Sequence, residues 1–128
     1  MTEGLTDKTG ASVTVELVLT GPINAYTANL ADGTPAGRAE FIDSPQAGDE
    51  RIFFHTEVDE QFGGRGLAGL LVREALEDSM RRNITIVPVC PLFARHLAKH
   101  GDEFTASGGV FRRPTSSDIA LVTRTAQS

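Results

Sequence analysis

The chain has 128 residues, enough for one domain with a core, and its 40% hydrophobic and 23% charged residues are typical of a soluble globular protein. The net charge of −5 argues against binding to nucleic acid or to an anionic membrane. No apolar run is long enough to cross a membrane, residues 1–12 lack a signal-peptide segment, and one cysteine excludes an internal disulfide. We therefore expect a cytoplasmic protein.

The first half of the chain is predicted to form antiparallel strands. Residues 1–12 are polar with two glycines, and we expect a flexible N-terminus there. Apolar residues then alternate with others over residues 13–19, which indicates a strand that Gly21-Pro22 ends. Further strands are expected on either side of the Asp32-Gly33 turn and after a Pro- and Gly-containing turn, at residues 25–31, 35–43 and 51–58.

The strand at residues 51–58 is followed by a glycine-rich turn and a helix over residues 67–82. His55 and Glu57 are two residues apart, so they share one face of the strand. The helix has apolar residues on one flank, and its acid-before-base pairs indicate an exposed opposite flank. These pairs are Glu77 with Arg81 and Asp78 with Arg82.

Three glycines in four residues, Gly63, Gly64 and Gly66, lie at the entrance of this helix. The first turn of a helix has unpaired N–H groups, and without side chains in the way a phosphate can reach them directly. Arg65 adds a guanidinium suited to phosphate contacts. The alternative is a flexible connection that binds no ligand.

The same stretch matches the dinucleotide pattern Gly64-x-Gly66-x-x-Gly69, but its context is wrong for a Rossmann fold. Five residues separate Val58 from Gly64, and residues 84–89 contain no acidic residue to bind a ribose. A P-loop is also excluded, because no Gly-Lys-Ser/Thr follows.

A short apolar strand over residues 84–89 and a second helix follow. Asn83 is expected to end the first helix in the left-handed conformation. Cys90 ends the strand and Pro91 opens a helix that we expect to run to His100 and close at Gly101. The apolar stripe of this helix is expected from Phe93, Ala94 and Leu97.

The pattern Gln61-x-x-Gly64-x-Gly66, between a strand and a helix, resembles the acyl-CoA pyrophosphate loop of the GNAT superfamily of N-acetyltransferases. His55-Thr56-Glu57-Val58 before the loop and Cys90-Pro91-Leu92-Phe93 after it resemble the small, stripped-down members of that superfamily. The resemblance covers about residues 25–104. It implies an α+β fold with a mixed, mainly antiparallel sheet of about five to six strands and two main helices. We expect the domain to span residues 13–106, between the flexible N-terminus over 1–12 and a C-terminal tail over 107–128.

The resemblance also implies the cofactor, acetyl-CoA or CoA, and its contacts. The pantetheine arm would lie between two splayed strands, bonded to the strand edge near Val58, with the thioester near Cys90. Many of these enzymes have a tyrosine in the following helix that protonates the thiolate, whereas this chain has Phe93 there and its only tyrosine is Tyr26. The implied cofactor-binding residues are Val58, Gln61, Gly63, Gly64, Arg65, Gly66, Leu67, Ala68, Cys90 and Phe93.

Cys90, Glu57 and His55 are the candidate catalytic residues. A helix N-terminus stabilises a thiolate, so Cys90 can act as the acid or as a transient acyl acceptor, unless it is only a small buried hydrophobe. Glu57 is the candidate base, and His55 can share this role or orient the Glu57 carboxylate. For either residue, the alternative is that it makes only a structural hydrogen bond.

Other polar residues carry weaker signals. His96 and His100 lie four apart on a helix but lack a third ligand, so we expect no metal site. Residues 107–118 are expected to be a loose linker containing Arg112 and Arg113, followed by an edge strand or a docking tail over 119–122.

We therefore predict an acetyl-CoA-dependent N-acetyltransferase that acts on an unidentified amine, either a small molecule or a protein lysine. The alternative is a CoA-binding module without turnover, and a third hypothesis is a regulator that prefers ATP or NAD. We expect a monomer or a weak homodimer.

Overall fold

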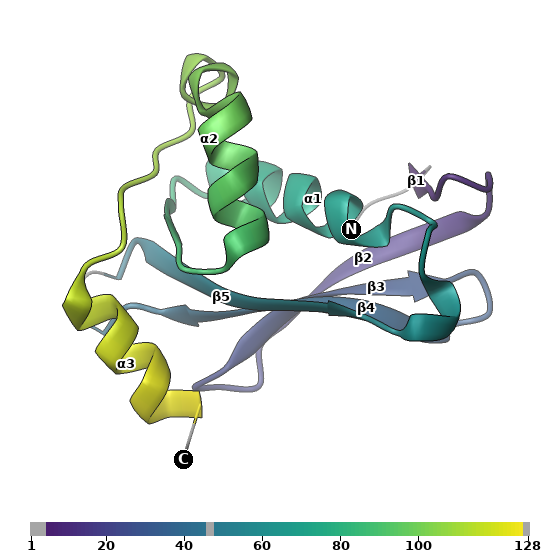
Figure 1. Ribbon diagram of the computed structural model, residues 1–128, viewed down its shortest axis with the longest axis horizontal. Coiled ribbons are helices and arrows are strands. Elements are labelled where there is room, and N and C mark those ends of the chain that lie inside the picture. The colour runs from purple at the N-terminus through teal and green to yellow at the C-terminus, as the bar shows by residue number, and fades with distance from the viewer. Residues whose placement is uncertain (1–4, 46–47, 127–128) are drawn as a thin grey trace.

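The computed structural model describes residues 5–45 and 48–126, and it consists of one mixed sheet with helices on both sides (Figure 1). The six strands lie side by side in chain order, antiparallel throughout except for the parallel pair β5 and β6. The elements are β1 (Leu5–Thr6), β2 (Ser12–Val18), β3 (Asn24–Leu30), β4 (Pro35–Asp43), β5 (Glu50–Val58), η1 (Glu60–Phe62), α1 (Leu67–Arg81), β6 (Thr85–Pro88), α2 (Pro91–Ala106) and α3 (Ser116–Ala126).

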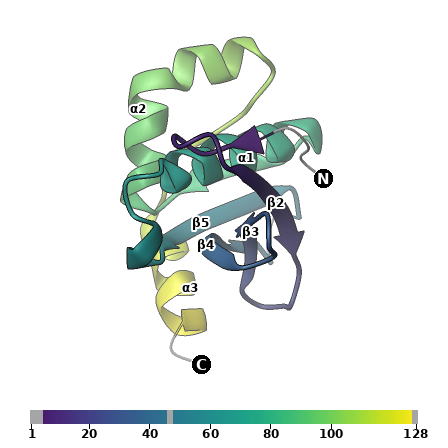
Figure 2. The same cartoon turned by 90° about the vertical axis from the view of Figure 1, so that its right-hand side faces the viewer.

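Helices α1 and α2 lie on one side of the sheet and α3 lies on the other, as the two perpendicular views show (Figure 2). The apolar flank of α1 packs on the middle strands and contributes Leu71 and Ala75, both fully buried. Within the described ranges, no helix has both the length and the apolar character needed to cross a membrane.

Local signals placed most of these elements correctly. The turn at Asp32-Gly33 joins β3 to β4, and Gly33 has a φ of 87°, a conformation that glycine adopts without strain. The predicted end of α1 is also confirmed, because Asn83 has a φ of 59°. One prediction for α1 is wrong, since Asp78 is buried rather than exposed.

Strand β5 contains an irregularity that determines which of its side chains face the helices. Glu40 pairs with His55 and the next residue of β4 pairs with Phe53, so Phe54 is an extra residue in β5, as in a β-bulge. The pairing of β6 with β5 ends at Phe53 and Pro88. Strand β5 continues to Val58, and its last residues therefore pair with β4 alone.

Helix α2 does not close at Gly101, as predicted, but continues to Ala106. Gly101 is buried in the helix, where an added Cβ would lie 2.8 Å from the ring of Phe111. The glycine is therefore needed for close packing with a residue ten positions later. The predicted apolar stripe is correct for Phe93 and Leu97, whereas Ala94 is exposed.

Both terminal segments are more structured than the sequence indicated. From Leu5 onward the segment expected to be flexible forms β1, which pairs with β2. Of the two alternatives for residues 119–122, the edge strand is wrong, because α3 covers this range. Its start has a capping box, in which the side chains of Thr115 and Asp118 each accept from the other's backbone N–H, at 3.4 and 2.7 Å.

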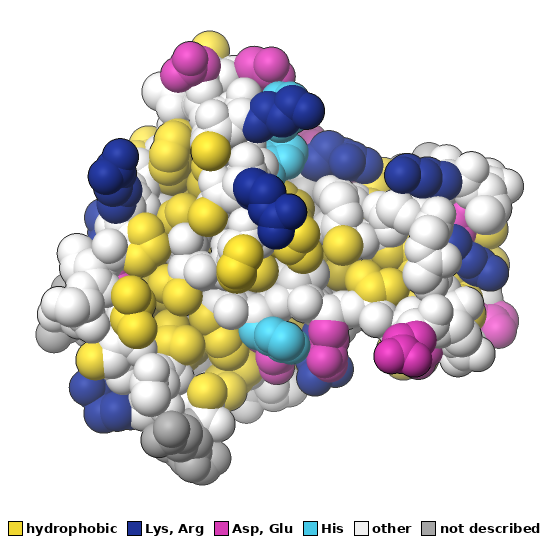
Figure 3. Space-filling view, viewed as in Figure 1, with side chains coloured by type: hydrophobic (Ala, Val, Ile, Leu, Met, Phe, Trp, Pro, Cys, Tyr) yellow, Lys and Arg dark blue, Asp and Glu magenta, His cyan; other side chains and the backbone are white. Residues whose placement is uncertain are grey.

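The segment between α2 and α3 is held by Arg112, whose guanidinium donates to Glu50 and Asp118 at 2.8 to 3.0 Å. The hydrogen bonds from Arg112 hold the pKa of Asp118 at about 2. Hydrophobic side chains gather between α2 and α3 on the face shown in Figure 3. Val110, between α2 and α3 in the chain, and Ile119 in α3 are exposed.

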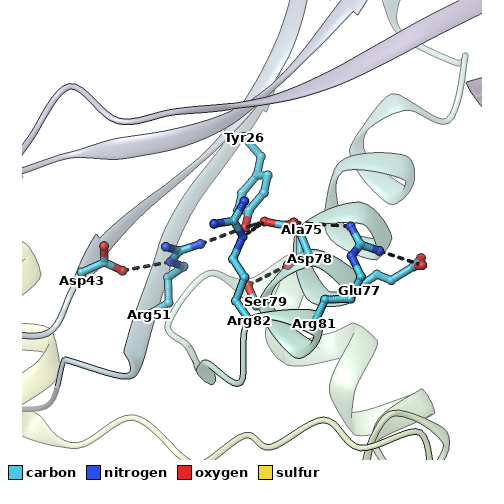
Figure 4. A network of polar contacts seen from close by, with 9 residues as sticks. All are labelled: Tyr26, Asp43, Arg51, Ala75, Glu77, Asp78, Ser79, Arg81 and Arg82. Atoms are coloured by element: carbon cyan, nitrogen blue, oxygen red, sulfur yellow. Dashed lines mark hydrogen bonds and ion pairs between the residues drawn. The ribbon is translucent and has the colours of Figure 1, made fainter. Parts of the chain in front are cut away.

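A buried polar network joins α1 to the sheet (Figure 4). The hydroxyl of Tyr26 donates to Asp78 at 2.6 Å and accepts from Arg51 at 2.9 Å. Asp78 also accepts from Arg82 at 2.9 Å, and Arg51 donates to Asp43 at the same distance. Burial, followed by the bond to Asp78, raises the pKa of Tyr26 to about 12, so the hydroxyl remains a donor at neutral pH.

We predict that Tyr26→Phe lowers the free energy of unfolding by about 1–3 kcal/mol, because Asp78 and Arg51 each lose a buried partner. Urea denaturation measures this loss. The control is Glu77→Gln, which breaks the exposed pair with Arg81 and is expected to change stability by less than about 1 kcal/mol. Equal stability of Tyr26→Phe and the wild type would contradict the structural role of this network.

Candidate active site

The unpaired end of β5 is an open backbone edge. The Asp59 N–H donates to Ala36 on β4 at 2.8 Å. Because successive N–H groups of a strand point to opposite sides, the Val58 N–H points away from β4, toward the side from which β6 is absent. A ligand with amide groups can pair with such an edge as an added strand does.

The glycine loop follows this edge through the short helix η1. The Asp59 side chain accepts from the Gln61 N–H at 3.1 Å, and the Gly63 N–H donates to Glu60 at the same distance. Gly64 has a φ of 81° and nothing within 4 Å of an added Cβ. A side chain at this position would therefore project into the space in front of the loop.

Helix α1 begins at the loop without a side-chain cap. Its N-cap is Gly66, with a φ of 77°, and its first turn contains no acidic residue. The first N–H groups of a helix have no partner within the helix, so those of Leu67 and Ala68 are donors for a ligand. The side chain of Leu67 is buried, which anchors the helix start in the core.

The two polar side chains predicted in the loop have different surroundings. Gln61 is exposed. The Arg65 guanidinium lies 5.2 Å from the centre of the Phe62 ring and 3.5 Å from the carboxylate of Asp7. Arg65 is therefore at the rim of the loop but already has an acidic partner.

Cys90 lies where β6 leaves the sheet, as the N-cap of α2. Its N–H donates to the Phe53 carbonyl at 2.8 Å, as does the Val89 N–H at 2.9 Å. The residue is only 3% exposed, and its sulfur lies 3.5 Å from the hydroxyl of Thr56. The thiol is thus buried against Thr56 on the side of β5 that faces the helices.

His55 and Glu57 do not meet Cys90 on one face of the sheet. Thr56 pairs with the fully buried Ala39 under α1, whereas Glu57 pairs with Arg38 and is exposed. Directly opposed residues of antiparallel strands share a face. The side chains of His55 and Glu57 are therefore on the face opposite Cys90.

On that opposite face the candidate bases form a polar cluster. The Glu57 carboxylate accepts from Arg38, and His55 Nε2 lies 3.4 Å from its other oxygen. A hollow of about 600 Å³ adjoins Glu57. Its charged lining residues are Arg38, Glu57, Asp59 and Glu60, so acidic groups predominate.

Other predicted residues lie away from this region. Phe93 is fully buried and stacks on Phe53 with ring centres 4.3 Å apart, so it belongs to the core rather than to a ligand surface. The rings of His96 and His100 lie 4.9 Å apart, and burial lowers the pKa of His96. Among the described residues, no group of three His, Cys, Asp or Glu side chains is placed to bind a metal.

Two residues near the site were missed from the sequence. Thr56 contacts Cys90, and strand alternation already placed it on the face opposite His55. Lys8 lies against Gly66, although it was assigned to a flexible N-terminus. No local signal predicts the position of Lys8, because its contact with the loop joins residues far apart in the chain.

A family model for GCN5-related N-acetyltransferases matches residues 25–106. This range begins in β3, ends with α2, and includes the β5 edge, the glycine loop and Cys90. It leaves out β1, β2 and α3. No match was found among curated proteins.

Several solved structures are similar to this chain, and the first of them shows its fold. The GNAT family N-acetyltransferase YhbS of Escherichia coli, in complex with CoA, matches with a TM-score of 0.52 and 16% identity over 90% of this chain and 93% of its own. An acetyltransferase of the GNAT family from Staphylococcus aureus Mu50 has a TM-score of 0.46 and 12% identity over 67% of this chain and 54% of its own. An aminoglycoside acetyltransferase from an uncultured soil metagenomic sample has a TM-score of 0.44 and 9% identity over 86% of this chain and 59% of its own. This chain therefore spans little more than half the length of the last two proteins.

Proposed function

We propose, from the premise that this chain belongs to the GCN5-related N-acetyltransferase family, that it transfers an acetyl group from acetyl-CoA to an amine. The observation that carries this proposal is the open edge of β5, which leads directly into a glycine-rich helix entrance with no side-chain cap. The backbone of an open strand edge can hydrogen-bond to the amides of pantetheine, and the N–H groups at the start of α1 can bind a pyrophosphate.

In this arrangement CoA lies along the β5 edge. The pyrophosphate accepts from backbone N–H groups at Gly64, Gly66, Leu67 and Ala68, with Gln61 and Arg65 at the rim. Gly63 positions the loop through its bond to Glu60. The pantetheine amides pair with the backbone at Val58, and the thioester reaches the gap beside Cys90 and Thr56.

The acceptor approaches from the other face. Glu57, assisted by His55, removes a proton from the ammonium form of the acceptor, and the neutral amine then attacks the thioester carbonyl. The acidic hollow beside Glu57 favours a cationic amine, either small or part of a protein lysine.

Cys90 acts as the acid on the helix side of the gap. The C–S bond breaks, the CoA thiolate takes the thiol proton, and the proton released by the amine returns to Cys90 through water. Burial of the thiol beside Thr56 favours this role over that of an acyl acceptor. The second candidate function, a CoA-binding module without turnover, is favoured by the separation of Glu57 and Cys90 on opposite faces.

We predict that Gly64→Asp abolishes binding of CoA and acetyl-CoA in calorimetric titrations, because the new carboxylate projects toward the phosphates. Gly108→Asp is the matched control. Gly108 also has a positive φ and nothing within 4 Å of an added Cβ, but it lies beyond the end of α2. Unchanged CoA binding by Gly64→Asp would refute the loop as the phosphate site.

We predict that Glu57→Gln and Cys90→Ala each lower kcat for acetyl transfer by about 10²-fold, the usual contribution of a general base or acid. The assay follows CoA release with a panel of cationic amines, and CoA affinity is measured for each variant. Glu60→Gln, which changes the charge of the same hollow, serves as the control for Glu57. Tight CoA binding without transfer to any amine would instead favour the binding module.

A further inference from the structure

The N-terminal hairpin, which lies outside the family match, packs on the glycine loop. Asp7 is buried in the turn after β1, where its carboxylate accepts from the N–H groups of Thr9 and Ala11 at 2.8 and 3.1 Å. The next residue, Lys8, donates its N–H to the Arg65 carbonyl at 2.9 Å. The hairpin is therefore bonded to the loop at the residue before the N-cap of α1.

The Lys8 side chain crosses Gly66. An added Cβ at Gly66 would lie 2.9 Å from Cε of Lys8 and 3.0 Å from its Cγ, closer than such atoms normally approach. Gly66 thus serves two purposes, since it permits the left-handed N-cap and leaves room for the lysine stem. The Lys8 ammonium, one bond beyond Cε, is held near the start of α1.

This ammonium belongs to a local basic cluster on an acidic protein. A hollow of about 320 Å³ is lined by Lys8, Arg65 and Arg73 and contains one acidic residue, Asp7. Asp7 already pairs with Arg65, and within residues 5–45 and 48–126 neither Lys8 nor Arg73 has an ion pair or side-chain hydrogen bond. Figure 3 shows several Lys and Arg side chains over α1 and α2, although the chain carries a net charge of −5.

Two cations without ion pairs, beside a helix entrance that has no acidic residue, give the hollow an excess of positive charge, because its one carboxylate, Asp7, is already paired with Arg65. Backbone N–H groups bond a phosphate directionally, and a lysine adds charge as a mobile point cation. The hollow adjoins the proposed pyrophosphate loop through the shared residues Arg65 and Gly66.

We propose that Lys8 binds a phosphate group of CoA, with Arg73 beside it, so that the N-terminal hairpin completes the cofactor site. This inference rests on the proposed function, because it assigns a further contact to the same ligand. The phosphate is either the pyrophosphate or the 3′-phosphate of the ribose, and both present the same chemistry to a lysine.

The test compares calorimetric titrations of the wild type and Lys8→Met with CoA, 3′-dephospho-CoA and pantetheine. Methionine keeps the apolar stem across Gly66 and removes the charge. We expect CoA to bind Lys8→Met about tenfold more weakly, the lower end of what a bond to a charged group contributes. A loss confined to CoA assigns the 3′-phosphate, whereas an equal loss with 3′-dephospho-CoA assigns the pyrophosphate.

Two variants serve as controls. Lys99→Met removes the other lysine of the chain, on the exposed side of α2, and is expected to leave CoA affinity unchanged. Lys8→Arg keeps the charge and is expected to retain most of the affinity. It also keeps the inference testable if Lys8→Met disturbs the hairpin.

Wild-type affinity of Lys8→Met for CoA would overturn this inference and leave the proposed function intact. The inference is also overturned if Lys8→Arg loses as much affinity as Lys8→Met, or if binding of phosphate-free pantetheine falls by the same factor. Failure of the wild type itself to bind CoA would overturn the proposed function, so the two failures are distinguishable.

Discussion

The site depends on how β5 stops pairing with β6. The carbonyl of Phe53 accepts from both Val89 and Cys90, which turns the chain out of the sheet and into α2. The extra residue Phe54 then shifts the side chains that follow, so that Thr56 shares the face of Phe53. In a strand that alternated regularly from Phe53, without the bulge, His55 and Glu57 would face the helices instead. The turn at Val89 and Cys90 therefore leaves the edge open, and the bulge at Phe54 assigns each polar side chain to a face.

This arrangement explains how a small domain can present two kinds of group to one gap. The edge of β5 is flanked by a buried thiol on the helix side and by an exposed carboxylate and imidazole on the other. A thioester in the gap would be open to an amine from the second side while its sulfur lies beside the first. Two segments outside the family match also contact the elements of this site. The N-terminal hairpin is hydrogen-bonded to the glycine loop. Arg112, which anchors α3, donates to Glu50, the first residue of β5.

Much of the fold follows from local sequence signals. The Asp32-Gly33 turn, the apolar flank of α1, the cap at Asn83 and the glycine loop are all properties of a few neighbouring residues. The errors come from contacts between distant residues. Gly101 is typical of a helix end, but in the structure it makes room for the ring of Phe111. Asp78 lies in a pattern typical of an exposed helix face, but its carboxylate accepts a hydrogen bond from Tyr26. Helix α3 is different, because its start has a local signal, the capping box formed by Thr115 and Asp118.

The candidate site was predicted in composition but not in geometry. The loop residues and Cys90 were located by pattern, yet alternation alone cannot tell which face of β5 meets the helices, because that depends on Phe54.

The central claim is that CoA occupies the open edge of β5 and the loop. Amide chemical shifts recorded by NMR during titration with CoA test it most directly. We predict the largest shifts at Val58, Gly64, Gly66 and Ala68, whereas unchanged amides there, with shifts confined to α3 or with none, would contradict the account.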